Sequence, residues 1–252
     1  TTNSPGPHDL QLMDQPWTAT APRYSAGRVL VVALPTVMPG AQIRYRTVTT
    51  FRDRPFFAEA AVLTTRAPVQ ERVVRLYAPT GVSMRIFEPS AAAPLTREDS
   101  VSNGVRTTTW RVHDIPPLPH EPAEPPPWLV GRCWLFSDGD WSEYARRLDE
   151  ALQGATAAGS SHTARLAQEI APESLPIARR IQAIRDAVAK HVREAGPNPF
   201  TLPLAELTSP DRVWSDGYGH NTDRAILLYA MLRAIGLQPS WIPATAVPAE
   251  VA

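Results

Sequence analysis

Side chains able to do chemistry are densest between residues 215 and 223, in the stretch SDGYGHNTD. Ser215 and His220 could form a nucleophile and base pair, and His220 could bind a metal ion together with Asp216 and Asp223. A metal site, however, commonly uses two histidines at positions i and i+4 of a helix, and this stretch contains a single histidine. We therefore expect neither a metal ion nor another cofactor.

The chain has one cysteine, Cys133, so it can form neither an internal disulfide nor a zinc site built from several thiolates. Cys133 lies among Trp and Leu in the run GRCWLF, which is typical of a strand. A lone buried cysteine usually acts as a small apolar side chain. We therefore expect Cys133 to be structural rather than catalytic.

The composition excludes several classes of protein. The 252 residues carry 25 Lys and Arg against 25 Asp and Glu, so the net charge is zero, whereas proteins that bind nucleic acid or anionic membranes need a positive surplus. Apolar residues make up 43% of the chain and charged residues 20%, which is typical of a globular protein. The longest apolar run, VLVVAL, is far shorter than the roughly 20 residues of a membrane span. We expect no nucleic-acid partner and no membrane span.

Residues 1–114 show the period of two that strands require. In 41–50, for example, Ile43 and Tyr45 fall on one face of an extended chain. Further strands are expected at 28–34, 69–77, 82–87 and 105–112. Asn103-Gly104 suits a two-residue hairpin turn, because both residues tolerate positive φ. Short strands separated by Pro and Gly turns predict an antiparallel β-sandwich-like domain.

Residues 115–127, IPPLPHEPAEPPP, contain seven prolines and can form neither a helix nor a central strand. Two interpretations remain open for this proline-rich connector. It could be a ligand for an aromatic groove, or a stiff strap packed between domains. Ile115 and Leu118 favour the strap, because they give it apolar side chains to bury.

Residues 128–252 are mainly helical in pattern, so the predicted fold class is α+β. Apolar residues recur every three or four positions in 140–152, 175–194 and 222–235, which predicts three helices. The Gly-, Ala- and Ser-rich run at 154–162 predicts a loop. Gly236 is a natural left-handed residue at the end of the last helix.

The run from Trp214 to Leu237, WSDGYGHNTDRAILLYAMLRAIGL, resembles the nucleophile segment of bacterial transglutaminase-like domains, which share the papain-type cysteine-protease core. In that family a glycine-rich loop delivers a Cys to the N-terminus of a buried helix, and an Asp follows two residues later. The matching positions are Gly219, Asp223, Ala225, Leu227, Leu228, Leu232, Arg233, Ala234 and Gly236. The resemblance implies a partial transglutaminase-like domain over 128–252, incomplete at its C-terminus.

The first half resembles the β-domain of unknown function that commonly precedes a transglutaminase-like domain in secreted bacterial proteins. Its traces are AP-x-Y at Ala21–Tyr24, LP-x-V-x-PG at Leu34–Gly40, and Trp110 followed by Asp114-Ile115-Pro116. That domain usually has further strands before the first residue seen here, and we expect this chain to lack them. The resemblance implies a periplasmic or other extracytoplasmic location, although this chain shows no signal peptide.

Asn221 stands where that family has its nucleophile. A neutral amide can be neither deprotonated nor made nucleophilic, whereas Asn is a good N-cap, so we expect Asn221 to cap the helix. The family's His and Asp come well after the nucleophile helix, and residues 222–252 contain no histidine. The resemblance therefore implies a degenerate active site, whose positions are Trp214, Gly219, His220, Asn221 and Asp223.

Three hypotheses about function follow. The first is a non-catalytic transglutaminase-like envelope protein that acts as a binding or scaffold module for a protein or a cell-envelope polymer. The second is a cysteine-type acyltransferase or peptidase whose nucleophile is replaced or whose His and Asp lie beyond this chain. The third is a glycan-binding β-sandwich, because the chain has seven tryptophans and indole faces stack on sugar rings.

Overall fold

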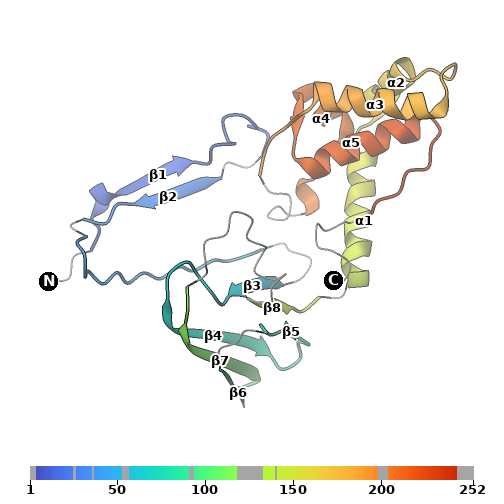
Figure 1. Ribbon diagram of the computed structural model, residues 1–252. Coiled ribbons are helices and arrows are strands. Elements are labelled where there is room, and N and C mark those ends of the chain that lie inside the picture. Colours follow the sequence, from blue (N-terminus) through green and yellow to red (C-terminus); the bar gives the residue numbers. More distant parts are fainter. Residues whose placement is uncertain are drawn as a thin grey trace. The chain divides into compact units, whose positions relative to one another are not determined.

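The computed structural model describes residues 4–24, 27–35, 37–52, 57–90, 94–117, 133–139, 141–197 and 204–242. Contacts within the chain divide it into two compact units (Figure 1). The first unit combines residues 1–53 with 148–241, and the second combines 54–147 with 242–252. Antiparallel sheets dominate the N-terminal part and helices the C-terminal part, so the predicted α+β class is confirmed. Within the described ranges, no helix is both long and apolar enough to cross a membrane.

The second unit contains two three-stranded antiparallel sheets. One has the order β3-β8-β5, formed by β3 (Ala58–Val62), β8 (Cys133–Ser137) and β5 (Arg85–Phe87). The other has the order β4-β7-β6, formed by β4 (Val69–Pro79), β7 (Val105–Ile115) and β6 (Leu95–Ser102). Strand β8 follows the proline-rich connector in sequence, yet it is the central strand of its sheet. The β-rich unit is therefore completed by a segment from the second half of the chain.

Both sheets contribute to one core. Trp110 of β7 and Trp134 of β8 are fully buried, and their ring centroids lie 6.4 Å apart. Phe136 of β8 also packs against Trp110, at 5.6 Å between centroids. The Trp110 indole N–H donates to Glu88 Oε1 at 2.8 Å, which satisfies the polar end of this side chain. Two sheets that share a buried aromatic core form a sandwich-like arrangement.

The sequence predicted β4, β5, β7 and β8 of this unit, missed β3 and β6, and was wrong about one further strand. Asn103 and Gly104 have φ of 50° and 74° and join β6 to β7, so the predicted hairpin turn is confirmed. The predicted strand at 41–50 is absent, although every residue of this range is described. Its apolar side chains Ile43 and Tyr45 are exposed. Period two alone does not make a strand, because the backbone also needs a neighbouring strand to pair with.

The first unit joins an N-terminal hairpin to the helices. The hairpin pairs β1 (Leu10–Asp14) with β2 (Arg28–Val32) after a short 3-10 turn, η1 (Pro7–Asp9). The helices are α1 (Trp141–Ala157), which begins in the second unit, α2 (Ser161–Ile170), α3 (Ile177–His191), α4 (Pro210–Asp216) and α5 (Asn221–Ala234). A two-residue parallel pair, β9 (Arg193–Glu194) with β10 (Tyr218–Gly219), and a 3-10 turn, η3 (Leu204–Glu206), complete it.

Helix α5 is the centre of the first unit's core. Its residues Leu227 and Met231 are fully buried against Ile184 of α3 and Val213 of α4. Gly236 ends it with φ of 86°, as predicted. Helices α3 and α5 match the predicted ranges closely. Helix α3 carries an apolar stripe of helical period, whereas α5 has a continuous apolar run from Ala225 to Leu232, as a helix buried on most sides does.

The predicted loop at 154–162 is wrong at both ends. Helix α1 continues to Ala157, and α2 begins at Ser161. The amide of Thr163 donates to Asp211 Oδ1 at 2.8 Å, and the amide of His162 donates to Asp211 Oδ2 at 3.1 Å. Asp211, on α4, thus caps a helix that lies about fifty residues earlier, which no local sequence signal reveals.

The two compact units do not follow the predicted division into 1–114, 115–127 and 128–252. Most of the proline-rich connector lies outside the described residues, so these boundaries stay a prediction. Ile115, at the end of β7, is buried in the core of the second unit. Residues 1–53, in contrast, group with the helices, and Tyr24 of the AP-x-Y segment lies at the start of α5.

Candidate functional site

The chain makes a turn between α4 and α5. Gly217 ends α4 in the left-handed conformation, with φ of 67°, and its amide donates to the Val213 and Trp214 carbonyls. Strand β10 follows, and α5 begins at once. Gly219 is buried in β10, where an added Cβ would lie 3.2 Å from Asp223 Cβ and 3.3 Å from Val213 Cγ1. A side chain at Gly219 would therefore crowd the N-terminus of α5.

Asp223, in the first turn of α5, is fully buried and accepts hydrogen bonds from three residues. Tyr24 Oη donates to Oδ2 at 2.7 Å, and the Thr208 amide donates to Oδ1 at 2.9 Å. Arg23 Nη2 also approaches Oδ2, at 3.3 Å. A buried carboxylate is tolerated only when it is paired in this way, so Asp223 depends on residues about 200 positions earlier.

Arg23 and Tyr24 connect the N-terminal segment to this turn. Tyr24 Oη accepts from the His220 backbone N–H at 2.7 Å, and its ring stacks on the His220 imidazole with centroids 5.1 Å apart. Arg23 forms an ion pair with Asp216 and donates to the Tyr218 carbonyl at 3.1 Å. We call Arg23, Tyr24, Asp216, His220 and Asp223 the Tyr24–Asp223 network.

The electrostatics of this network follow from burial. Burial, followed by the hydrogen bond to Asp223, raises the pKa of Tyr24, so its phenol stays protonated and can donate. Burial lowers the pKa of Arg23, but the hydrogen bonds to Asp216 and Tyr24 outweigh this effect and raise that pKa overall. Burial also lowers the pKa of His220, against the opposing attraction of Asp223. The network therefore holds a protonated phenol, a charged guanidinium and a neutral imidazole.

The hydrogen bonds assign the tautomer of His220. Its Nδ1 accepts from the Asp223 backbone N–H at 3.2 Å, so in the neutral ring the proton lies on Nε2. Nε2 is buried and has no hydrogen-bond partner among the residues that the structure describes; its distance to Asp223 Oδ1 is 3.6 Å. His220 thus acts as the side-chain N-cap of α5.

Asn221 occupies a different place from the predicted one. It is the first residue of α5 and is exposed, while His220 takes the N-cap position. The prediction that Asn221 caps the helix is therefore wrong. Tyr24 fixes the backbone of His220 through the amide N–H, and this places the imidazole rather than the Asn221 amide over the first turn.

Four of the five predicted site positions lie together at the start of α5: Gly219, His220, Asn221 and Asp223. Trp214 lies apart from them, in the preceding helix α4. Its ring stacks on the His191 imidazole with centroids 4.0 Å apart, and its carbonyl contacts His191 Nε2 at 3.0 Å. The sequence reasoning missed Arg23 and Tyr24 as members, and it grouped Asp216 with His220 and Asp223 only as possible metal ligands. The AP-x-Y trace contained a signal for Tyr24, but nothing in it indicated which residue Tyr24 contacts.

No group of three or more His, Cys, Asp or Glu side chains in the described part of the chain could hold a metal ion. Cys133 is fully buried in β8 of the second unit, and burial raises the pKa of its thiol. A catalytic thiol needs the opposite shift, because the thiolate is the nucleophile. The surroundings of Cys133 are therefore those of a structural core residue.

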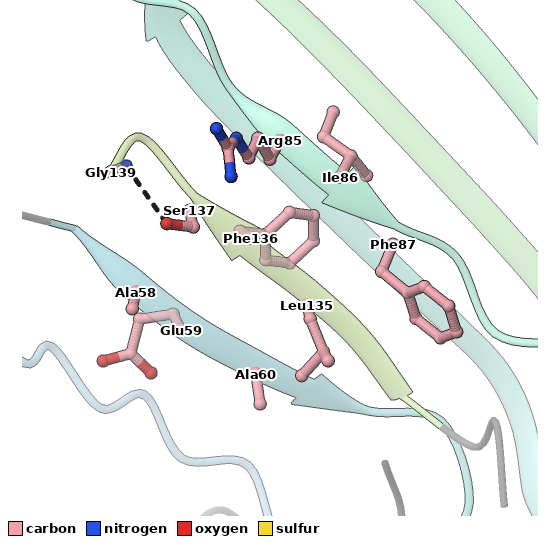
Figure 2. A pocket seen from close by; sticks show the side chains of 10 residues that line it. All are labelled: Ala58, Glu59, Ala60, Arg85, Ile86, Phe87, Leu135, Phe136, Ser137 and Gly139. Carbon is pink, nitrogen blue, oxygen red and sulfur yellow. Dashed lines mark hydrogen bonds between the residues drawn. The ribbon is translucent and has the colours of Figure 1, made fainter. Parts of the chain in front are cut away.

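The second unit contains a pocket of about 560 Å³ over the sheet β3-β8-β5 (Figure 2). Apolar side chains of all three strands line it, among them Ala60, Phe87 and Leu135, which are cross-strand neighbours. Its polar lining comprises Glu59, Arg85 and Ser137, together with the Gly139 amide that donates to Ser137 Oγ. This arrangement offers an apolar surface, whereas the Tyr24–Asp223 network is a buried polar cluster.

Comparison with known proteins gives two likenesses. Residues 1–119 match the family model of a domain of unknown function that has a solved structure, DUF3857. No curated protein matches the chain in sequence. A crystal structure from Parabacteroides distasonis ATCC 8503, described as a "putative protease", is similar with a TM-score of 0.74 and 18% identity. The match covers 92% of this chain and 45% of that one, so this chain spans less than half the length of that protein. The chain thus shares the fold of the matched part of the Parabacteroides protein and carries a DUF3857-like first half.

Proposed function

We propose that this chain is a non-catalytic, transglutaminase-like module that binds a protein or a cell-envelope polymer outside the bacterial cytoplasm. The observation that carries the proposal is the exposed Asn221 in the first turn of α5. A cysteine-type enzyme of this fold would need a thiolate there, and an amide has no proton that can be removed to give a nucleophile.

The groups around Asn221 support the same conclusion. Asp223 and His220 are buried rather than open to a substrate. The Asp223 carboxylate accepts from Tyr24, and His220 Nδ1 accepts from the Asp223 amide. A general base must reach the proton that it removes, within about 3 Å or through one water. The hydrogen bonds of the Tyr24–Asp223 network instead stabilise the turn before α5, which is a structural role. The similar fold of the Parabacteroides protein is compatible with this, because fold alone does not determine activity.

Thiol labelling tests the proposal directly. The folded wild-type chain is expected to resist iodoacetamide, because its single thiol, Cys133, is buried and has a raised pKa. Asn221→Cys is expected to react stoichiometrically, and at pH 7 about two- to fivefold faster than the exposed control Ser100→Cys. The α5 N-terminus favours the thiolate over the thiol by up to about 1 kcal/mol. Mass spectrometry of the labelled chains measures both rates.

Two outcomes would contradict the proposal. Stoichiometric reaction of the folded wild-type protein with an activity-based thiol probe, at a single site, would mean that a reactive nucleophile exists. Acyl transfer to amine donors by Asn221→Cys would favour the second hypothesis, in which the scaffold is that of an acyltransferase or peptidase with its nucleophile replaced. Two features favour this second function: the glycine turn and the buried Asp223 at the start of α5.

The glycan-binding hypothesis draws less support. Trp110 and Trp134 are fully buried in the sandwich core, so neither indole face is open to a sugar ring. Trp17 is partly buried and packs edge-on against Tyr24, at 6.5 Å between ring centroids. Titration with cell-wall polysaccharide, followed by tryptophan fluorescence, separates a polymer ligand from a protein partner for the proposed module.

A further inference from the structure

Several buried side-chain nitrogens in the described part of the first unit have no hydrogen-bond partner, and His220 Nε2 is one of them. His220 Nε2 is enclosed and lies too far from Asp223 Oδ1, at 3.6 Å, for a good hydrogen bond. Buried polar groups are nearly always satisfied, so an orphan of this kind needs a physical account. Because Nε2 forms no hydrogen bond, the imidazole is held in place by Nδ1 and by the stacking of its ring face.

The neutral imidazole makes two contacts that join separate parts of the chain. Nδ1 accepts from the Asp223 amide and so caps α5. The ring face stacks on Tyr24, whose hydroxyl binds both the His220 amide and the Asp223 carboxylate. The capping bond exists only while Nδ1 is unprotonated, because a protonated imidazole has donors at both nitrogens and no acceptor.

Protonation would place a second cation beside Arg23. Within the described residues, the charged and titratable groups acting on His220 are Asp223 on α5, Arg23 and Tyr24 on the N-terminal segment, and Asp216 on α4 through its ion pair with Arg23. Asp223 attracts an imidazolium, but its oxygens already accept from Tyr24, Arg23 and Thr208. Burial and Arg23 act against the charge, and burial is the largest effect.

We propose that the Tyr24–Asp223 network is a pH-sensitive latch, in which protonation of His220 releases residues 21–24 from the N-terminus of α5. The direction of the pH dependence follows from burial, which lowers the pKa of His220 in the closed state below its ordinary value of about 6.5. The open state then binds the proton more tightly, so the closed state loses stability as the pH falls below about 6.5 and until the lowered pKa is passed. Above that range the latch stays closed. Opening would uncover the first turn of α5 beside Asn221.

Hydrogen exchange of the full chain tests the latch. After correction for the intrinsic pH dependence, exchange of the His220 and Asp223 amides is expected to accelerate between pH 7 and pH 5 by up to about 25-fold. This limit is the increase in the statistical weight of the open state, neutral plus protonated, between the two pH values when the open-state imidazole has a pKa of about 6.5. His220→Asn is the key variant, because its amide oxygen can still cap α5 but does not titrate. It is expected to exchange at nearly the same corrected rate at both pH values.

His113→Asn serves as the matched control, since His113 is an exposed histidine of β7 and is expected to leave the acceleration unchanged. Equal acceleration in the wild type and in His220→Asn would overturn the proposal, as would no acceleration in the wild type. If His220→Asn does not fold, NMR titration of the wild-type His220 imidazole gives a second measurement. The apparent midpoint of amide opening must then follow protonation of that ring, and independent midpoints would reject the latch. The latch requires no thiol, so this experiment and the labelling experiment can fail separately.

Discussion

Asp223→Ala is expected to lower the free energy of unfolding of the first unit by about 3–5 kcal/mol, the usual cost of breaking a buried ion pair by removing one partner. The substitution leaves Tyr24 Oη and the Thr208 amide without their acceptor, and it removes one of the two carboxylates that neutralise Arg23. Because the helices lie mainly in this unit, urea denaturation followed by far-ultraviolet circular dichroism measures the effect.

Two further variants control this measurement. Asp223→Asn keeps the shape and one acceptor oxygen but loses the charge, so it should cost less than Asp223→Ala. Asp186→Ala removes a carboxylate whose ion pair with Arg185 is largely exposed, and it should change stability by no more than about 1 kcal/mol. A cost for Asp223→Ala no larger than that for Asp186→Ala would mean that the Tyr24–Asp223 network does not stabilise the unit.

Gly196→Ala is expected to destabilise the first unit by about 2–6 kcal/mol, through two separate costs. Gly196 has φ of 118°, a conformation that L-residues rarely adopt, which costs about 1–3 kcal/mol. An added Cβ would also overlap the Tyr24 ring, lying 2.7 Å from Cδ2, and crowding in a packed site adds about 1–3 kcal/mol. The same denaturation experiment measures the sum.

Gly236→Ala isolates the backbone cost. Gly236 also has positive φ, of 86°, but an added Cβ there would meet no atom within 4 Å. It should therefore cost only about 1–2 kcal/mol. If the two substitutions cost the same, Tyr24 does not pack against Gly196 as described. A double variant with Tyr24→Ala should show non-additivity for Gly196→Ala and simple additivity for Gly236→Ala.

The sequence predicted best where a structure depends on neighbours in the chain. Helices α3 and α5 were predicted because apolar residues recur at helical spacing in both, and the 103–104 turn because both residues accept positive φ. The predictions failed where the deciding partner is distant. The predicted loop at 154–162 covered the end of α1 and the start of α2, whose cap is the distant Asp211. Residues 41–50 were predicted as a strand, although no strand in the described part of the chain pairs with them.

For the candidate site, the sequence by itself determined the identity of the residues at the start of α5, and with it the absence of sulfur at Asn221. Only the tertiary structure decided that His220 caps that helix and that Arg23 and Tyr24 complete the buried cluster. The physical reason is that a buried carboxylate requires donors, and the chain supplies them from a segment about 200 residues away that local patterns do not connect to α5.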